Sequence, residues 1–96
     1  MYKIVMSLQA QKALKYIKGK DLKLLKRAID ELARDPYAKS NVRKLTYKSG
    51  YYRLRVSRWR VIYLILTFRK ELWIENIFMR KEDDDYERRL KAVLFL

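Results

Sequence analysis

The sequence of 96 residues contains no cysteine and no histidine, and it has only one proline and two glycines. Without cysteine, the chain can form no disulfide and can use no thiolate; this suits a reducing compartment, and we expect the protein in the cytoplasm. Without histidine, it lacks the side chain that most often moves protons near neutral pH. Any catalysis is therefore left mainly to arginine, lysine and tyrosine.

Long apolar runs are also missing, since the longest covers residues 61–66 and is only as long as a strand. The apolar stretch at the N-terminus is too short for a signal peptide, and no glycine-rich phosphate loop is present. We therefore expect no membrane association and no nucleotide-triphosphate chemistry. Half of the residues are hydrophobic, which predicts one globular domain over residues 1–96 with a modest core.

Acidic residues are scarce in the middle of the chain. The net charge is +13, and no Asp or Glu occurs between Asp35 and Glu71, a segment that holds ten Lys and Arg residues. A folded surface with charge of one sign repels itself, and this cost is usually tolerated where the partner is a polyanion. The charge pattern therefore favours a nucleic acid, an acidic protein or an anionic membrane over a simple solubility effect.

The first third of the chain has helical periodicity. Ser7 is a candidate N-cap for a first helix, which should end before Gly19. Asp21 is a candidate N-cap for a second helix, which Asp35-Pro36 should end. Apolar residues of the second helix recur at helical spacing, at Leu22, Leu25, Ile29 and Leu32. These segments predict a helix hairpin that needs a sheet to cover its apolar side.

Strand patterns occupy most of the remaining chain. We predict strands at residues 2–6, 44–47, 51–57, 59–68 and 71–80, and a closing helix over residues 82–94. The fold class is therefore α+β, with a helix hairpin packed on a mostly antiparallel sheet of four to five strands, in the order β-α-α-β-β-β-α. Strand 51–57 alternates, so that Arg53 and Arg55 should face away from the helices and form a cationic surface.

The available side chains suit one reaction, the attack of a ribose 2′-hydroxyl on its own phosphodiester. The substrate supplies the nucleophile, while arginines orient and stabilise the phosphate, so that no metal and no cofactor are needed. The acidic run Glu82–Asp85 suits the first turn of a helix better than a metal site. Composition leaves two interpretations open, an RNA-binding protein and a metal-independent ribonuclease.

The stretch GYYRLRVSRWRVIYLI, residues 50–65, resembles the signature of the RelE/ParE superfamily of type II toxins. The resemblance extends over nearly the whole chain, including the hairpin with its Asp-Pro stop and the spacing from Arg80 to Tyr86. It implies the RelE fold, which is similar to that of microbial ribonucleases. It also implies a ribosome-dependent, metal-independent endoribonuclease that cleaves mRNA in the ribosomal A site and inhibits translation.

The resemblance also assigns roles to individual positions. Arg60 stands where RelE-like toxins carry a phosphate-binding arginine, Arg80 where they carry an arginine important for the chemistry, and Tyr86 where a tyrosine stacks on a base or transfers a proton. These three are the predicted catalytic residues. Because lysines that act as a base in some members are replaced at 53 and 55, the base is left to Tyr86, Lys44, Lys48 or Lys81. The predicted RNA-binding residues are Lys44, Lys48, Arg53, Arg55 and Arg58.

Alternatives remain at this stage. Arg60 could instead pair with Glu75, Arg80 could pair with Asp83 or Asp84, and Tyr86 could be a core residue. The ParE-like members of the superfamily poison DNA gyrase, and an inactive RNA-binding relative is a third alternative. The resemblance further implies a cognate protein antitoxin, with which the chain would form a hetero-oligomer, besides rRNA and mRNA as partners.

Overall fold

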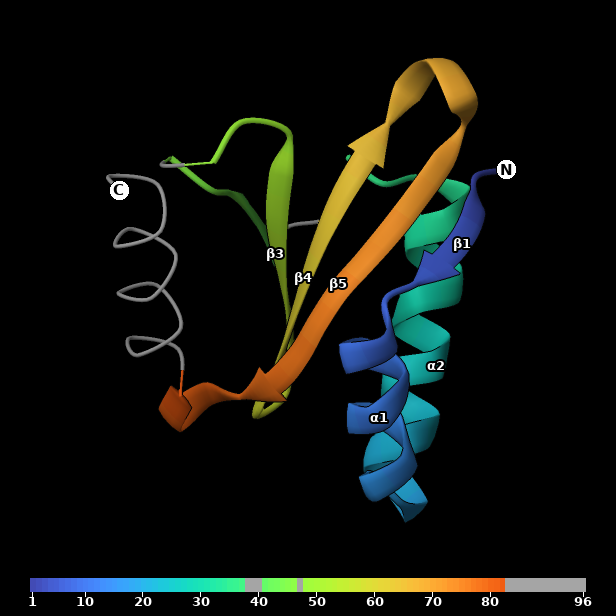
Figure 1. The fold of residues 1–96 in the computed structure, drawn as a ribbon. Coiled ribbons are helices and arrows are strands. Elements are labelled where there is room, and N and C mark those ends of the chain that lie inside the picture. The colour runs from blue at the N-terminus through green and yellow to red at the C-terminus, as the bar shows by residue number, and fades with distance from the viewer. Residues whose placement is uncertain (38–40, 47, 83–96) are drawn as a thin grey trace.

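A computed structural model describes residues 1–37, 41–46 and 48–82 of the chain (Figure 1). Two helices follow the first strand, and the remaining strands come after them. The elements are β1 (Lys3–Met6), α1 (Leu8–Tyr16), α2 (Gly19–Arg34), β2 (Val42–Lys44), β3 (Tyr51–Val56), β4 (Trp59–Leu66) and β5 (Glu71–Met79), with 3-10 turns η1 (Thr67–Arg69) and η2 (Arg80–Glu82). The predicted α+β fold is confirmed, while the predicted closing helix over residues 82–94 lies almost wholly outside the described residues.

The sheet has five strands in the order β1-β5-β4-β3-β2. β1 runs parallel to β5, and every other neighbouring pair is antiparallel. The prediction erred at β2, which covers Val42–Lys44 and not residues 44–47. The reason is the packing of two apolar residues: Val42 packs against the main core, whereas Leu45 has left the strand and is buried in a second cluster.

Both helices lie on one side of the sheet (Figure 1). Ser7 caps α1 as predicted, because its Oγ accepts a hydrogen bond from the amide of Ala10. The predicted cap of α2 is wrong: the helix begins at Gly19 and its N-cap is Lys18, so that Asp21 lies in the first turn. Neither helix, within the part of the chain that is described, is long and apolar enough to cross a membrane.

The described residues form two apolar clusters, one on each face of the sheet. The main core joins the helices to the sheet through buried residues such as Leu25, Leu32, Tyr63 and Ile74. A smaller cluster on the opposite face contains Leu45, Ile62 and Phe78, with Tyr51 packed against it. The face predicted to be simply cationic is therefore partly apolar, because its central strands bury side chains on both sides.

The β3–β4 hairpin turns through two residues, Ser57 and Arg58, since Val56 pairs with Trp59. Ser57 has a φ of 54°, in the left-handed region that glycine usually occupies. A residue with a Cβ pays about 1–2 kcal/mol for this conformation. Contacts from outside the hairpin must therefore help to keep the turn in this shape.

Candidate nucleic-acid interface

Arginines stand opposite one another on the face of the sheet away from the helices. Arg43 of β2 pairs with Arg53 of β3, and Arg55 of β3 pairs with Arg60 of β4. Residues directly opposite in an antiparallel pair share a face, and like charges placed there destabilise the sheet. We call these four residues the arginine face. Its two like-charged pairs suit a surface that binds an anion, which would offset their repulsion.

Arg60 is buried, with only 7% of its surface exposed. Its Nη1 donates hydrogen bonds to the carbonyl oxygens of Ser57 at 3.1 Å and of Trp59 at 2.9 Å. The β3–β4 turn therefore fixes the guanidinium, a geometry that keeps a charged donor in place before any ligand arrives. Glu75, which the sequence offered as a partner for Arg60, forms its ion pair with Lys48 at 3.4 Å.

Arg80 lies at the same end of the sheet as Arg55 and Arg60. Its amide donates a hydrogen bond of 2.6 Å to the carbonyl oxygen of Arg58 in the β3–β4 turn, and Phe78, two residues earlier, pairs with Arg60. The side chain of Arg80 is exposed. Sheet pairing thus gathers three arginines that are distant in sequence, while the catalytic roles of Arg60 and Arg80 stay predictions. Tyr86 lies outside the described residues.

The predicted RNA-binding residues divide between the two faces. Arg53 and Arg55 belong to the arginine face, whereas Lys44 pairs with Tyr52, whose ring packs against the main core on the helix side. Arg58 also turns toward the helices, where it binds Asp21. The structure therefore brings only part of the predicted set together, although the RNA-binding roles of all five residues stay predictions.

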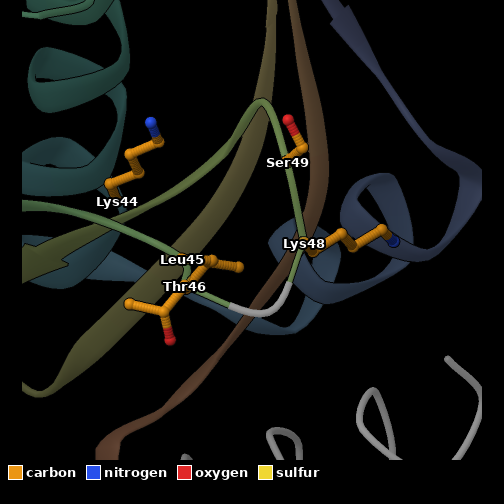
Figure 2. Close-up of a pocket in the computed structure, with 5 residues that line it drawn as sticks. All are labelled: Lys44, Leu45, Thr46, Lys48 and Ser49. Atoms are coloured by element: carbon orange, nitrogen blue, oxygen red, sulfur yellow. The ribbon is translucent and has the colours of Figure 1, made fainter. Parts of the chain in front are cut away.

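The loop from β2 to β3 forms an open hollow of about 560 Å³, lined by Lys44, Leu45, Thr46, Lys48 and Ser49. Figure 2 shows that Lys44 and Lys48 leave this loop in different directions. Lys48 Nζ reaches Glu75 and lies 4.0 Å from the centre of the Tyr51 ring. An ammonium held by a carboxylate and a ring face is positioned at the side of the arginine face rather than free in solvent.

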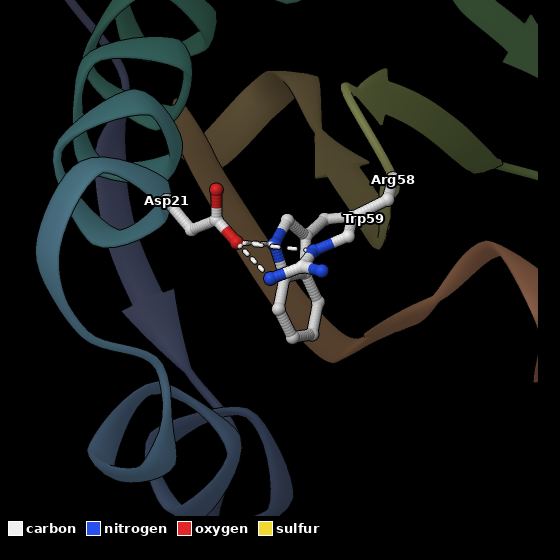
Figure 3. Close-up of polar contacts among 3 residues, drawn as sticks. All are labelled: Asp21, Arg58 and Trp59. Carbon is white, nitrogen blue, oxygen red and sulfur yellow. Dashed lines mark hydrogen bonds and ion pairs between the residues drawn. The ribbon is translucent and has the colours of Figure 1, made fainter.

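Asp21 and Arg43 are two residues of this region that the site prediction missed. The prediction missed Arg43 because it placed the start of this strand two residues late. The neighbouring Val42, a residue type that favours strands, was the signal for the earlier start. Asp21 was interpreted as a helix cap, yet its carboxylate accepts hydrogen bonds from Trp59 and Arg58 (Figure 3). These bonds, first that from Trp59 and then that from Arg58, hold the pKa of Asp21 below its ordinary value. No group of three potential metal-ligating side chains occurs within the described ranges.

Comparison with known proteins identifies the family. Residues 4–84 match the family described as the ParE toxin of the type II toxin-antitoxin system parDE. The chain belongs to this toxin family. It is a type II toxin of the RelE/ParE superfamily, as the resemblance in residues 50–65 predicted. A comparison with curated proteins finds no significant sequence match.

Solved structures support the same fold for this toxin. The isolated RelE toxin of E. coli superposes with a TM-score of 0.75 at 17% identity, covering 97% of this chain and 99% of that one. A chain of the archaeal RelE–RelB complex from Pyrococcus horikoshii gives a TM-score of 0.74 at 25% identity, covering 82% and 94%. A chain of the RelB–RelE complex from Methanococcus jannaschii gives 0.71 at 23% identity, covering 85% and 96%.

Proposed function

We propose that this toxin is a ribosome-dependent, metal-independent endoribonuclease that cleaves mRNA in the ribosomal A site and so inhibits translation. The observation that carries the proposal is the gathering of Arg55, Arg60 and Arg80 at one end of the sheet. Guanidinium groups bind phosphate oxygens through paired hydrogen bonds and keep their charge at any physiological pH. Similarity of fold to RelE toxins supports this function over simple RNA binding.

The burial of Arg60 divides the work among the three arginines. Arg55 and Arg80 are exposed and would contact the RNA backbone first, whereas Arg60 would stabilise charge from behind, through the small part of its surface that is exposed. The 2′-oxygen attacks the adjacent phosphorus and the bond from phosphorus to the 5′-oxygen breaks. The products carry a 2′,3′-cyclic phosphate and a 5′-hydroxyl. Tyr86 or a lysine takes the proton from the 2′-hydroxyl, and the leaving 5′-oxygen takes a proton from solvent.

A cognate antitoxin is the second partner that we propose. The solved structures from Pyrococcus horikoshii and Methanococcus jannaschii are described as complexes of RelE with RelB. By analogy, this toxin would form a hetero-oligomer with an antitoxin that covers the arginine face. An acidic segment in that antitoxin would offset the repulsion between the paired arginines.

Poisoning of DNA gyrase is a second candidate function, which the family match favours because that family is described by its ParE toxins. Two assays separate the candidates. In a cell-free translation reaction, the ribonuclease yields truncated mRNA that primer extension maps to A-site codons. A gyrase poison instead leaves the mRNA whole and accumulates cleaved plasmid when it is incubated with gyrase.

The variant Arg80→Ala tests the site. We expect cleavage of mRNA on ribosomes to fall on the order of a hundredfold or more, because a positioned donor to the transition state is lost. Arg69→Ala is the matched control. This substitution removes the same charge at the opposite end of β4, where Arg69 pairs with Glu71 at 3.4 Å. Equal cleavage by both variants would exclude Arg80 from the site.

A further inference from the structure

The carboxylate of Asp21 connects the helix hairpin to the β3–β4 turn. One oxygen, Oδ2, accepts hydrogen bonds from Arg58 Nε at 3.1 Å, Arg58 Nη2 at 2.7 Å and Trp59 Nε1 at 3.0 Å. Figure 3 shows both donor side chains converging on this carboxylate. The Arg58 guanidinium also lies 5.7 Å from the centre of the Trp59 ring. Two consecutive residues of the turn are thus held by one side chain of α2.

The backbone of the same turn holds the arginines of the proposed site. The carbonyl groups of Ser57 and Trp59 accept from Arg60 Nη1, and the carbonyl group of Arg58 accepts from the Arg80 amide. Three successive carbonyl groups therefore fix one guanidinium and the start of η2. Any movement of the turn would displace both arginines together.

The turn depends on contacts from outside the hairpin to keep this shape. Ser57 occupies the left-handed region although it is not a glycine. The turn lies where the pairing of β3 with β4 ends. Strained backbone persists where surrounding contacts over-determine it. Asp21 supplies such contacts: its side chain is 24% exposed, its bond from Trp59 is partly buried, and its bonds from Arg58 are exposed.

We propose that Asp21 is a positioning residue for the arginine site, which acts on Arg60 and Arg80 through the β3–β4 turn without contacting RNA. The proposal rests on the proposed ribonuclease function for its effect on cleavage. Its effect on the structure does not depend on that function. Arg58, predicted from sequence to bind RNA, then acts as the partner of Asp21.

The test compares Asp21→Ala and Asp21→Asn with the control Asp30→Asn, which changes an exposed carboxylate on the same helix. Single-turnover cleavage on programmed ribosomes separates rate from binding. At saturating ribosomes we expect Asp21→Ala to lower the cleavage rate on the order of tenfold, while half-saturation changes by less than about twofold. Asp21→Asn should fall between it and the wild type, because its amide oxygen still accepts from Trp59.

Two further measurements separate positioning from general loss of stability. In the background that combines Arg60→Ala with Arg80→Ala, Asp21→Ala should cost little more, because residues that act through the same groups are not additive. Hydrogen exchange of the folded protein should show the Arg80 amide exchanging about tenfold faster in Asp21→Ala, with amides in the middle of β4 unchanged.

The outcomes are distinct. Unchanged exchange at the Arg80 amide, or a rate loss that simply adds to that of the variant lacking both Arg60 and Arg80 side chains, would overturn the role of Asp21. A wild-type toxin that cuts no mRNA would overturn the proposed function, and the exchange of the Arg80 amide would still decide whether Asp21 holds the turn.

Discussion

At the scale of single residues, Arg60 shows how the chain keeps a charge inside the fold. A buried guanidinium is costly unless its donors are satisfied, and each hydrogen bond from a charged donor contributes about 1.5–3 kcal/mol. The carbonyl groups of Ser57 and Trp59 supply acceptors without adding negative charge. These carbonyl groups fix the orientation of the guanidinium, and a charged donor held in a fixed orientation is suited to an anionic ligand.

Tyr63 is a second buried polar residue, and its hydroxyl predicts a dependence on pH. The hydroxyl donates to the carbonyl oxygen of Pro36 at 3.2 Å, and the ring stacks on Tyr52. Burial raises the pKa of Tyr63 above its ordinary value of 10.0, and the neighbouring Tyr52 and Tyr37 add to this. A raised pKa means that the stabilisation is complete below pH 10.0 and is lost as the pH rises above it.

We therefore expect Tyr63→Phe to be less stable than the wild type by about 1–3 kcal/mol near neutral pH, since the Pro36 carbonyl loses its donor. Above pH 10.0 the difference should shrink, because the phenol that unfolding exposes then ionises and stabilises the unfolded wild type, whereas the variant has no such group. Urea unfolding of both proteins from pH 8 to 11 measures this. A constant difference over that range would contradict the explanation.

At the scale of elements, Ser7 joins α1 to the irregular part of β5. Its Oγ accepts from the Ala10 amide at 3.0 Å and donates to the Glu75 carbonyl at 2.5 Å, and its amide donates to the Ile74 carbonyl at 2.9 Å. The register of β4 and β5 shifts at this point, between Ile62 and Tyr63. An extra residue in a strand leaves a carbonyl group without a ladder partner, and Ser7 satisfies it.

Ser7→Ala should therefore cost about 1–2 kcal/mol, because it removes a helix cap and a partner of the bulge together. For a domain of this size, that corresponds to a melting temperature lower by about 4–16 °C. Ser49→Ala, in the exposed β2–β3 turn, is the control and should melt like the wild type. Equal melting temperatures of the two variants would contradict the proposed structural role of Ser7.

The elements also show what the sequence could predict. The spacing of Leu25, Ile29 and Leu32 gave α2, and the alternation of Leu54 and Val56 gave β3, because each pattern is local and repeats. The prediction for Asp21 failed because aspartate is typical of a helix start, and its role was inferred from its neighbours in sequence alone. Its partners Arg58 and Trp59 are 37 and 38 residues away, and long-range hydrogen bonds determined its role.

The candidate site was likewise predictable only where a local pattern determines it. Alternation placed Arg53 and Arg55 on the correct face of β3, since side-chain direction in a strand follows from parity. Parity gives the face but not the depth, so the burial of Arg60 could not be foreseen. The position of Arg58 in the turn, where parity ends, also allowed its side chain to leave the arginine face for the helix side.

At the scale of the whole molecule, the net charge of +13 makes association with RNA sensitive to salt. Each phosphate neutralised by the protein releases counterions, so the logarithm of affinity falls linearly with the logarithm of salt concentration, by about 0.7 per contact on single strands and 0.9 on duplexes. Under the proposed function, the arginine face would supply contacts of this kind. Arg55 is an exposed member, and its removal should disturb the fold little.

We expect Arg55→Ala to weaken binding to ribosomes at low salt and to reduce the salt slope by about 1, with binding measured between 50 and 300 mM KCl as a rough range. The control Arg69→Ala carries the same loss of net charge, but Arg69 already faces Glu71 at the far turn, so its slope should stay near that of the wild type. If the two variants share one slope, binding depends on total charge alone, because a localised contact would be lost only from Arg55→Ala. A difference between them places a phosphate at the end of the sheet where Arg60 and Arg80 lie.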